Sequence, residues 1–165
     1  MMRLFLLFFL LSALALKSQE SFIYFGSEDL TKLDSNWRFT TQDKPEFKEV
    51  AFNDSLWTPM RTQLFEKERE KAGFKGIGWF RLHLKLNPAL DSIPLSLYMV
   101  QEGASEIYID GKKIKEFGVI GTSENNQQRY TPENEIIFFH PKFDREIVIA
   151  IRYSNYSYEH SFDKT

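Results

Sequence analysis

The most regular alternation of apolar and polar residues runs from Gly76 to Leu86. Its members form an apolar side and a mostly polar side: Phe80, Leu82, Leu84 and Leu86 on the first, and Trp79, Arg81, His83 and Lys85 on the second. A period of two is typical of a β-strand that buries one face. Gly76 and Gly78 suit a sharp entry into it. The sequence therefore predicts a central strand here, around which the other elements are organised.

Shorter alternating or apolar runs predict further strands at residues 22–25, 37–39, 95–100, 106–109, 113–117, 135–139 and 146–153. Asp110-Gly111 separates two of them, which is a strong hairpin signal. Residues 118–129 form a polar loop, and residues 141–145 supply a turn. Leu64 to Ala72 is charged almost throughout, which favours a solvated loop with a turn or two of helix. Many short strands and little helix predict an all-β jelly-roll sandwich.

Phe52 and Trp57 flank the polar triplet Asn53-Asp54-Ser55. Side chains of these three types bond to nearby backbone and favour turns. We interpret the segment as a structural corner whose two aromatic residues reach the core.

Composition narrows the class of protein. A chain of 165 residues with 42% hydrophobic residues suits one folded domain. Its net charge of −2 gives no reason to expect a nucleic-acid partner. It contains no cysteine, which removes disulfides, cysteine-based zinc sites and thiol catalysis.

The N-terminus predicts export. Arg3 precedes an apolar run from Leu4 to Leu16, which is shorter than the ~20 residues that span a bilayer. We interpret residues 1–18 as a signal peptide, cleaved after Ala15 or near Ser18. An uncleaved anchor or a buried helix is the alternative. If the signal peptide is removed, residues 19–165 are expected to form one ligand-binding domain in the periplasm or outside the cell. This domain would be attached to a membrane only through a segment beyond this chain.

Five pieces of sequence resemble the N-terminal sugar-binding domain of family-2 glycoside hydrolases, a jelly roll of the galactose-binding-domain-like type. They are Phe52–Trp57 (F-N-D-S-L-W), Gly76–Arg81 (G-I-G-W-F-R), Ala104–Lys112 (A-S-E-I-Y-I-D-G-K), Tyr130–Pro132 (Y-T-P) and Ile149–Arg152 (I-A-I-R). They follow the family's order from about Trp37 to Asn155. The same domain type resembles extracytoplasmic modules of bacterial membrane receptors, where membrane helices and a kinase, phosphatase or cyclase follow.

The resemblance implies no catalytic residue in this chain, because the family's acid and nucleophile glutamates lie in a later barrel domain. It also implies one more strand after the piece near Tyr153, whereas residues 154–165 are polar and irregular. We therefore expect a fragment of a longer protein, unless the last strand is lost or comes from elsewhere.

Candidate chemistry is sparse. His83, His140 and His160 show no metal-ligand spacing and are interpreted as surface residues, and no cofactor motif occurs. A sugar needs an aromatic platform with planar polar groups beside it. The sequence offers two sets: Trp79 with Arg81, and Tyr130 with Gln128 and Arg129. The second is preferred because binding residues concentrate on loops, whereas Trp79 is more often a packing residue.

Three functions follow. The first is a non-catalytic extracytoplasmic sensor module for a small ligand such as a carbohydrate, in a longer signalling protein such as a sensor histidine kinase. The second is the N-terminal domain of a family-2-like glycosidase without its barrel. The third is a cell-envelope interaction domain. The ligand, the oligomeric state and calcium binding stay open.

Overall fold

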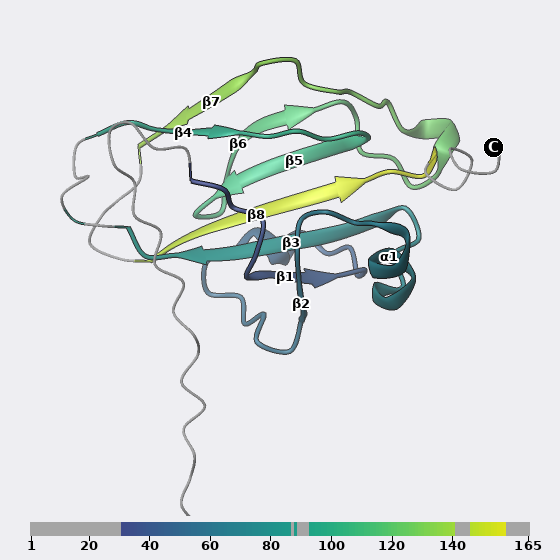
Figure 1. Ribbon diagram of the computed structural model, residues 1–165, viewed down its shortest axis with the longest axis horizontal. Helices are drawn as coiled ribbons and strands as arrows, with labels where there is room; N and C mark the ends of the chain where they lie inside the picture. Colours follow the sequence, from purple (N-terminus) through teal and green to yellow (C-terminus); the bar gives the residue numbers. More distant parts are fainter. Residues whose placement is uncertain (1–30, 87, 89–92, 141–145, 158–165) are drawn as a thin grey trace, which may run out of the picture.

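The computed structural model describes residues 31–86, 88, 93–140 and 146–157, and these form two antiparallel sheets (Figure 1). The larger sheet has six strands in the order β2-β1-β3-β8-β5-β6. Their bounds are β1 Trp37–Thr40, β2 Thr58–Met60, β3 Ile77–Leu84, β5 Ala104–Ile109, β6 Lys112–Phe117 and β8 Ile147–Ser154. The smaller sheet pairs β4 (Leu95–Tyr98) with β7 (Ile136–Phe139). The all-β sandwich expected from the sequence is confirmed.

The main core lies between the two sheets. Phe80, Leu82 and Leu84 of β3 pack there with Ile147, Ile149 and Ile151 of β8 and with Ile107 of β5. Leu95 and Ile137 contribute from the smaller sheet. The apolar side predicted for the central strand is therefore correct, and each strand presents alternate residues to the core because its side chains point to opposite faces.

The predicted strands inside the described residues are all present, and their ends agree within two residues. Residues 22–25 and the turn at 141–145 lie outside the described part of the chain. β2 is a strand that the sequence pattern did not predict. The charged stretch forms the short helix α1 (Glu66–Ala72), in which no residue is buried, as expected. Among the described residues, no helix is long and apolar enough to cross a membrane.

The predicted hairpin joins β5 to β6. Asp110 and Gly111 both have positive φ, at 50° and 80°, which is the backbone pattern of a two-residue type I′ turn. The Asp110 carboxylate also accepts a hydrogen bond from the Val148 backbone N–H at 3.0 Å. The turn is thereby attached to β8 as well as to its own two strands.

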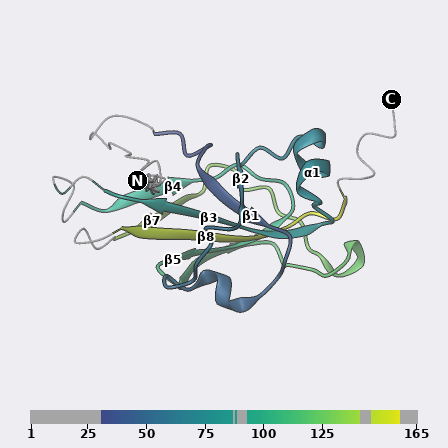
Figure 2. The ribbon, with the colours of Figure 1, turned by 90° about the horizontal axis from the view of Figure 1, so that it is seen from below.

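The polar side of β3 is also buried. The segment with the 3₁₀ helix η1 (Pro45–Lys48) lies against the opposite face of the six-stranded sheet from the main core (Figure 2). A second apolar cluster forms there from Phe47, Trp79 and Ala150, with Phe52, Trp57 and Tyr108 packed around it. The corner interpretation of residues 52–57 is confirmed, and β3 is covered on both faces.

Candidate functional site

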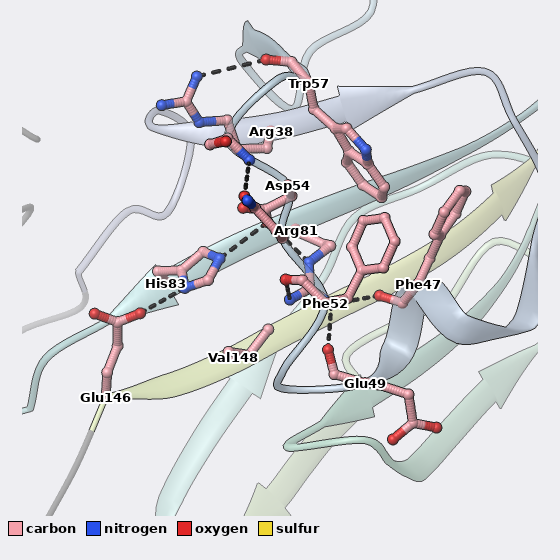
Figure 3. A network of polar contacts seen from close by, with 12 residues as sticks. Arg38, Phe47, Glu49, Phe52, Asp54, Trp57, Arg81, His83, Glu146 and Val148 are labelled. Atoms are coloured by element: carbon pink, nitrogen blue, oxygen red, sulfur yellow. Dashed lines mark hydrogen bonds and ion pairs between the residues drawn. The ribbon is translucent and has the colours of Figure 1, made fainter.

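A buried arginine dominates the second face. Arg81 is 0% exposed, and its Nε–H donates to Asp54 Oδ2 at 2.8 Å (Figure 3). Its terminal nitrogens donate to the backbone carbonyls of Phe47, Glu49 and Phe52, the last two at 3.0 and 3.4 Å. Each carbonyl belongs to the segment that covers this face. One side chain of β3 thus fixes the path of eight covering residues, from 47 to 54.

His83 extends this network toward solvent. Its Nε2 lies 2.9 Å from Asp54 Oδ2, and its Nδ1 lies 2.5 Å from Glu146 Oε1 (Figure 3). The side chain is 34% exposed. The interpretation as a surface histidine is therefore incomplete, since the ring bridges two carboxylates, one on the corner and one just before β8. We call Asp54, Arg81, His83 and Glu146 the corner anchor.

The charges of the corner anchor shift its pKa values. Burial alone would raise the pKa of the Asp54 carboxyl, but hydrogen bonds from His83 and Arg81 outweigh it, so this pKa lies below its ordinary value. The hydrogen bond to Asp54 raises the pKa of His83, and burial opposes this rise without cancelling it. Both shifts favour the charged forms. The corner anchor is therefore an ion-pair network that holds the corner on the sheet.

Trp79 lies on the same face and is 1% exposed. Its indole N–H donates to Asp43 Oδ1 at 2.8 Å, and its ring stacks on Tyr108 with centroids 5.7 Å apart. Arg152 completes the surroundings with hydrogen bonds to Asp43 at 2.6 and 2.8 Å. An exposed sugar platform at Trp79 and Arg81 is therefore wrong for this structure. The covering segment, which follows β1 in the chain, converts the polar side of β3 into interior.

Tyr130, in contrast, lies on the surface. It keeps 43% of its surface exposed, and its ring is stacked on Phe117 with centroids 5.7 Å apart and planes 4° apart. Its backbone N–H donates to the Gly103 carbonyl at 2.7 Å, and its hydroxyl donates to the Glu135 carboxylate. The ring is thus supported from behind and fixed at both ends.

The neighbours of Tyr130 present planar polar groups. Arg129 pairs with Glu102 at 3.2 Å, and these side chains are 48% and 65% exposed. Gln128 is exposed, and its backbone forms a two-way bridge with Val119, through hydrogen bonds of 2.8 and 3.0 Å. Gln128, Arg129 and Tyr130 are all exposed and lie on one surface. No contact described in the structure joins them to Trp79 or Arg81.

Three segments meet at this end of the sandwich. The Glu102 carbonyl accepts hydrogen bonds from the Tyr153 hydroxyl at 2.5 Å and from the Asn155 amide at 3.5 Å. The Gln127 side chain accepts one from the Tyr156 backbone at 3.2 Å. We call the surface formed by residues 101–103, 127–130 and 153–156 the end cluster.

Gly103 permits the close approach within the end cluster. Its φ is 105°, and a Cβ at this position would lie 2.3 Å from the backbone oxygen of Ser154. Any other residue would therefore push the 101–103 turn away from β8. The sequence did not predict a role for residues 101–103, since a glycine alone does not reveal which strand it approaches.

The end cluster contains buried polar atoms that have no hydrogen-bond partner within the described chain. They are Gln101 Oε1, Gln127 Nε2, Asn155 Oδ1 and Ser154 Oγ, so each of the three segments supplies at least one. The other end of each of these amides is bonded within the cluster. A buried polar atom without a partner costs about 1–3 kcal/mol, so native proteins retain few of them. The end cluster therefore combines an exposed aromatic and charged surface with buried polar groups whose bonding capacity is not fully used within the described chain.

No three histidine or carboxylate side chains among the described residues are grouped so as to hold a metal ion. The residues of the end cluster instead offer an aromatic face, a guanidinium, a carboxylate and amides. Such a set suits a polar ligand that also has an apolar face.

These features define the chain as an antiparallel β-sandwich domain with an aromatic and polar loop surface at one end. A β-glucuronidase from Bacteroides uniformis matches 76% of this chain over 14% of its own length, with a TM-score of 0.55 and 22% identity. A family-2 glycoside hydrolase from Bacteroides cellulosilyticus matches 74% of the chain over 17% of its own length, with a TM-score of 0.52 and 18% identity. A further family-2 β-glucuronidase matches 74% of the chain with a TM-score of 0.52.

At these identities the comparisons show the fold. They confirm the resemblance to one sandwich domain of family-2 glycoside hydrolases, and the chain corresponds to 14% of the length of the Bacteroides uniformis enzyme. No protein-family model and no curated protein matches the sequence.

The corner anchor gives a stability prediction. Asp54→Asn removes the carboxylate and leaves the Arg81 guanidinium buried without its charge partner. Removing one member of a buried ion pair typically costs about 3–5 kcal/mol. We expect a loss of that size in the free energy of unfolding, measured by urea denaturation. The control is Glu116→Gln, which removes an exposed pair with Lys113 and should cost less than about 0.5 kcal/mol. Equal losses in the two variants would contradict a structural role for Asp54.

The same network predicts a pH optimum of stability. The raised pKa of His83 adds stability that is complete below its ordinary value of 6.5 and is lost as the pH rises through the higher folded value. The lowered pKa of Asp54 adds stability that is complete above 3.8 and is lost as the pH falls through the lower folded value. The contribution of the network should therefore be largest between about pH 4 and 6.5, as measured by unfolding midpoints.

The variant His83→Gln tests whether His83 causes the loss of stability above pH 6.5. Glutamine cannot be protonated, so the unfolding midpoint of this variant should fall less above pH 6.5. The loss of stability at acid pH, which comes from Asp54, should remain. If the variant loses stability above pH 6.5 as the original protein does, a group other than His83 causes that loss.

Proposed function

We propose that this chain is a non-catalytic extracytoplasmic module that binds a carbohydrate at the end cluster. The observation that carries the proposal is the exposed Tyr130 ring with the Arg129–Glu102 pair beside it. Sugar rings stack their C–H faces on aromatic rings, and their hydroxyls seek planar donors and acceptors. The Phe117 ring and the Glu135 hydrogen bond hold Tyr130 in place, so little ordering would be needed on binding.

The unpartnered amide atoms support the same proposal. A sugar hydroxyl can donate and accept at once, and ordered water can pass a hydrogen bond from such a group to a buried amide. Gln101 and Asn155 supply unused acceptors and Gln127 an unused donor, so the cluster could satisfy hydroxyls in both directions. A ligand with several hydroxyls fits this pattern better than a purely apolar one.

The chain would act as the sensing part of a longer membrane signalling protein, such as a sensor histidine kinase. The predicted signal peptide favours this arrangement. The second candidate is the N-terminal domain of a family-2-like glycosidase, which the shared sandwich of the β-glucuronidases favours. The reading frame that follows residue 165 distinguishes them, since membrane helices support the first and a barrel domain the second.

Export is tested by expressing the full chain in a Gram-negative host and sequencing the N-terminus of the periplasmic product. We expect it to begin between residues 16 and 20, because a signal peptidase cuts after small residues. A product that starts at Met1 and stays with the cytoplasm or membrane would refute the signal peptide.

Binding is tested by thermal unfolding of the purified protein against a panel of mono- and oligosaccharides, with and without calcium. A ligand that binds the folded state raises the midpoint by mass action. Tyr130→Ala should remove the shift caused by a positive sugar and weaken its affinity at least tenfold, which is about 1.4 kcal/mol.

Tyr98→Ala is the matched control, because Tyr98 is exposed to a similar degree, 47% against 43%, but lies on β4. It should leave the shift unchanged. A positive sugar whose effect survives Tyr130→Ala would place the site elsewhere. A cooperative transition with no shift across the panel would instead favour the interaction domain.

A further inference from the structure

Among the described residues the smaller sheet has two strands, opposite a layer of six. Within the described residues β4 pairs with β7 alone, so the other edge of β4 has no strand beside it. Isolated two-stranded sheets are marginally stable, and an open strand edge presents backbone N–H and C=O groups that can pair with another strand. The free edge of β4 is therefore a docking position for an extended segment.

Both faces of this sheet are apolar. Leu95 and Ile137 point into the main core. On the outer face, Tyr98 pairs with Ile136 and Ser96 pairs with Phe138, and the three large side chains are 47%, 54% and 69% exposed. A strand added to this sheet should thus be apolar on both faces, unlike the alternating strands of the larger sheet.

The path of the chain leads to this edge. In both views the coloured trace of the described chain begins on the β4 side of the smaller sheet and away from β7 (Figures 1 and 2). Leu33 then packs against the main core, and its carbonyl accepts a hydrogen bond from the Trp37 indole at 2.9 Å. A segment a few residues upstream of residue 31 could therefore reach the free edge.

The sequence just upstream has the required pattern. Phe22-Ile23-Tyr24-Phe25 is apolar or aromatic at every position, and it follows the predicted cleavage sites. Residues 26–30 separate it from Thr31, and five residues span at most ~17 Å when extended. This reach covers several strand spacings of ~4.8 Å.

We propose that Phe22–Phe25 docks on the free edge of β4 (Leu95–Tyr98) as the third strand of the smaller sheet. Two of its side chains would extend the main core, and two would extend the outer apolar face. Its backbone would pair the N–H and C=O groups that the edge of β4 presents. The N-terminal segment is then part of the sandwich and not a tether.

Because the chain has no cysteine, engineered disulfides give an unambiguous test. Ile23→Cys with Leu97→Cys, and Tyr24→Cys with Ser96→Cys, report a full antiparallel register. Ile23→Cys with Ser96→Cys, and Tyr24→Cys with Leu97→Cys, report a parallel one. Disulfides need Cβ atoms about 3.5–4.5 Å apart, so neighbouring strands qualify and separated ones do not.

The full-length chain, processed by its host, is oxidised at low concentration and the bond is mapped by mass spectrometry. We expect an intramolecular disulfide in the pairs of one register. Pairing Ile23→Cys or Tyr24→Cys with Phe138→Cys on β7 is the control and should not give one. Bonds to β7 alone, or bonds between two chains, would overturn the proposal.

Hydrogen exchange of the β4 backbone amides tests for docking in any other strand register, which the disulfide pairs would miss. Tyr24→Pro removes a backbone donor and disfavours strand pairing, so the β4 amides that face the free edge should exchange at least tenfold faster. Ser27→Pro lies outside the segment and should leave them unchanged. No disulfide to β4, together with unchanged exchange in Tyr24→Pro, would also overturn the proposal.

Discussion

The burial of one guanidinium constrains the rest of this fold. Arg81 has no exposed surface, so its charge must be balanced within the protein. Asp54 supplies the charge, and three carbonyls of the 47–52 segment accept hydrogen bonds from the terminal nitrogens. These contacts hold the corner over β3 and close the second face of the large sheet. The apolar cluster around Trp79 and Phe47 forms as a result of that closure.

Much of the fold could be predicted from local patterns, since strand period and turn chemistry act over a few residues. The 76–86 alternation predicted β3, and Asp110-Gly111 predicted the hairpin. The role of the polar side of β3 could not be predicted in this way, because it depends on a segment about 30 residues earlier in the chain. Arg81 and Asp54 stand 27 positions apart, and nothing between them reveals the pair.

The candidate site was predictable to the extent that it lies on one loop. Gln128, Arg129 and Tyr130 were found because an aromatic residue in a polar loop is unusual enough to notice. Gln101, Glu102 and Asn155 were missed, since their meeting depends on how the ends of β5 and β8 align. Trp79 was a candidate for an exposed platform, but it is buried. The alternation shows which side of the strand a side chain is on, but not whether another segment covers that side.

β8 connects the two polar regions and also keeps them apart. Glu146, the residue just before β8, belongs to the corner anchor. Residues 153–156, at the other end of β8, belong to the end cluster. Six paired residues, 147 to 152, lie between the two regions, and the seven steps from Glu146 to Tyr153 span roughly 23 Å of strand. At that distance free-energy changes are additive. An engineer could therefore tune the stability of this domain at the corner and redesign its recognition surface at the other end, treating the two as independent parts.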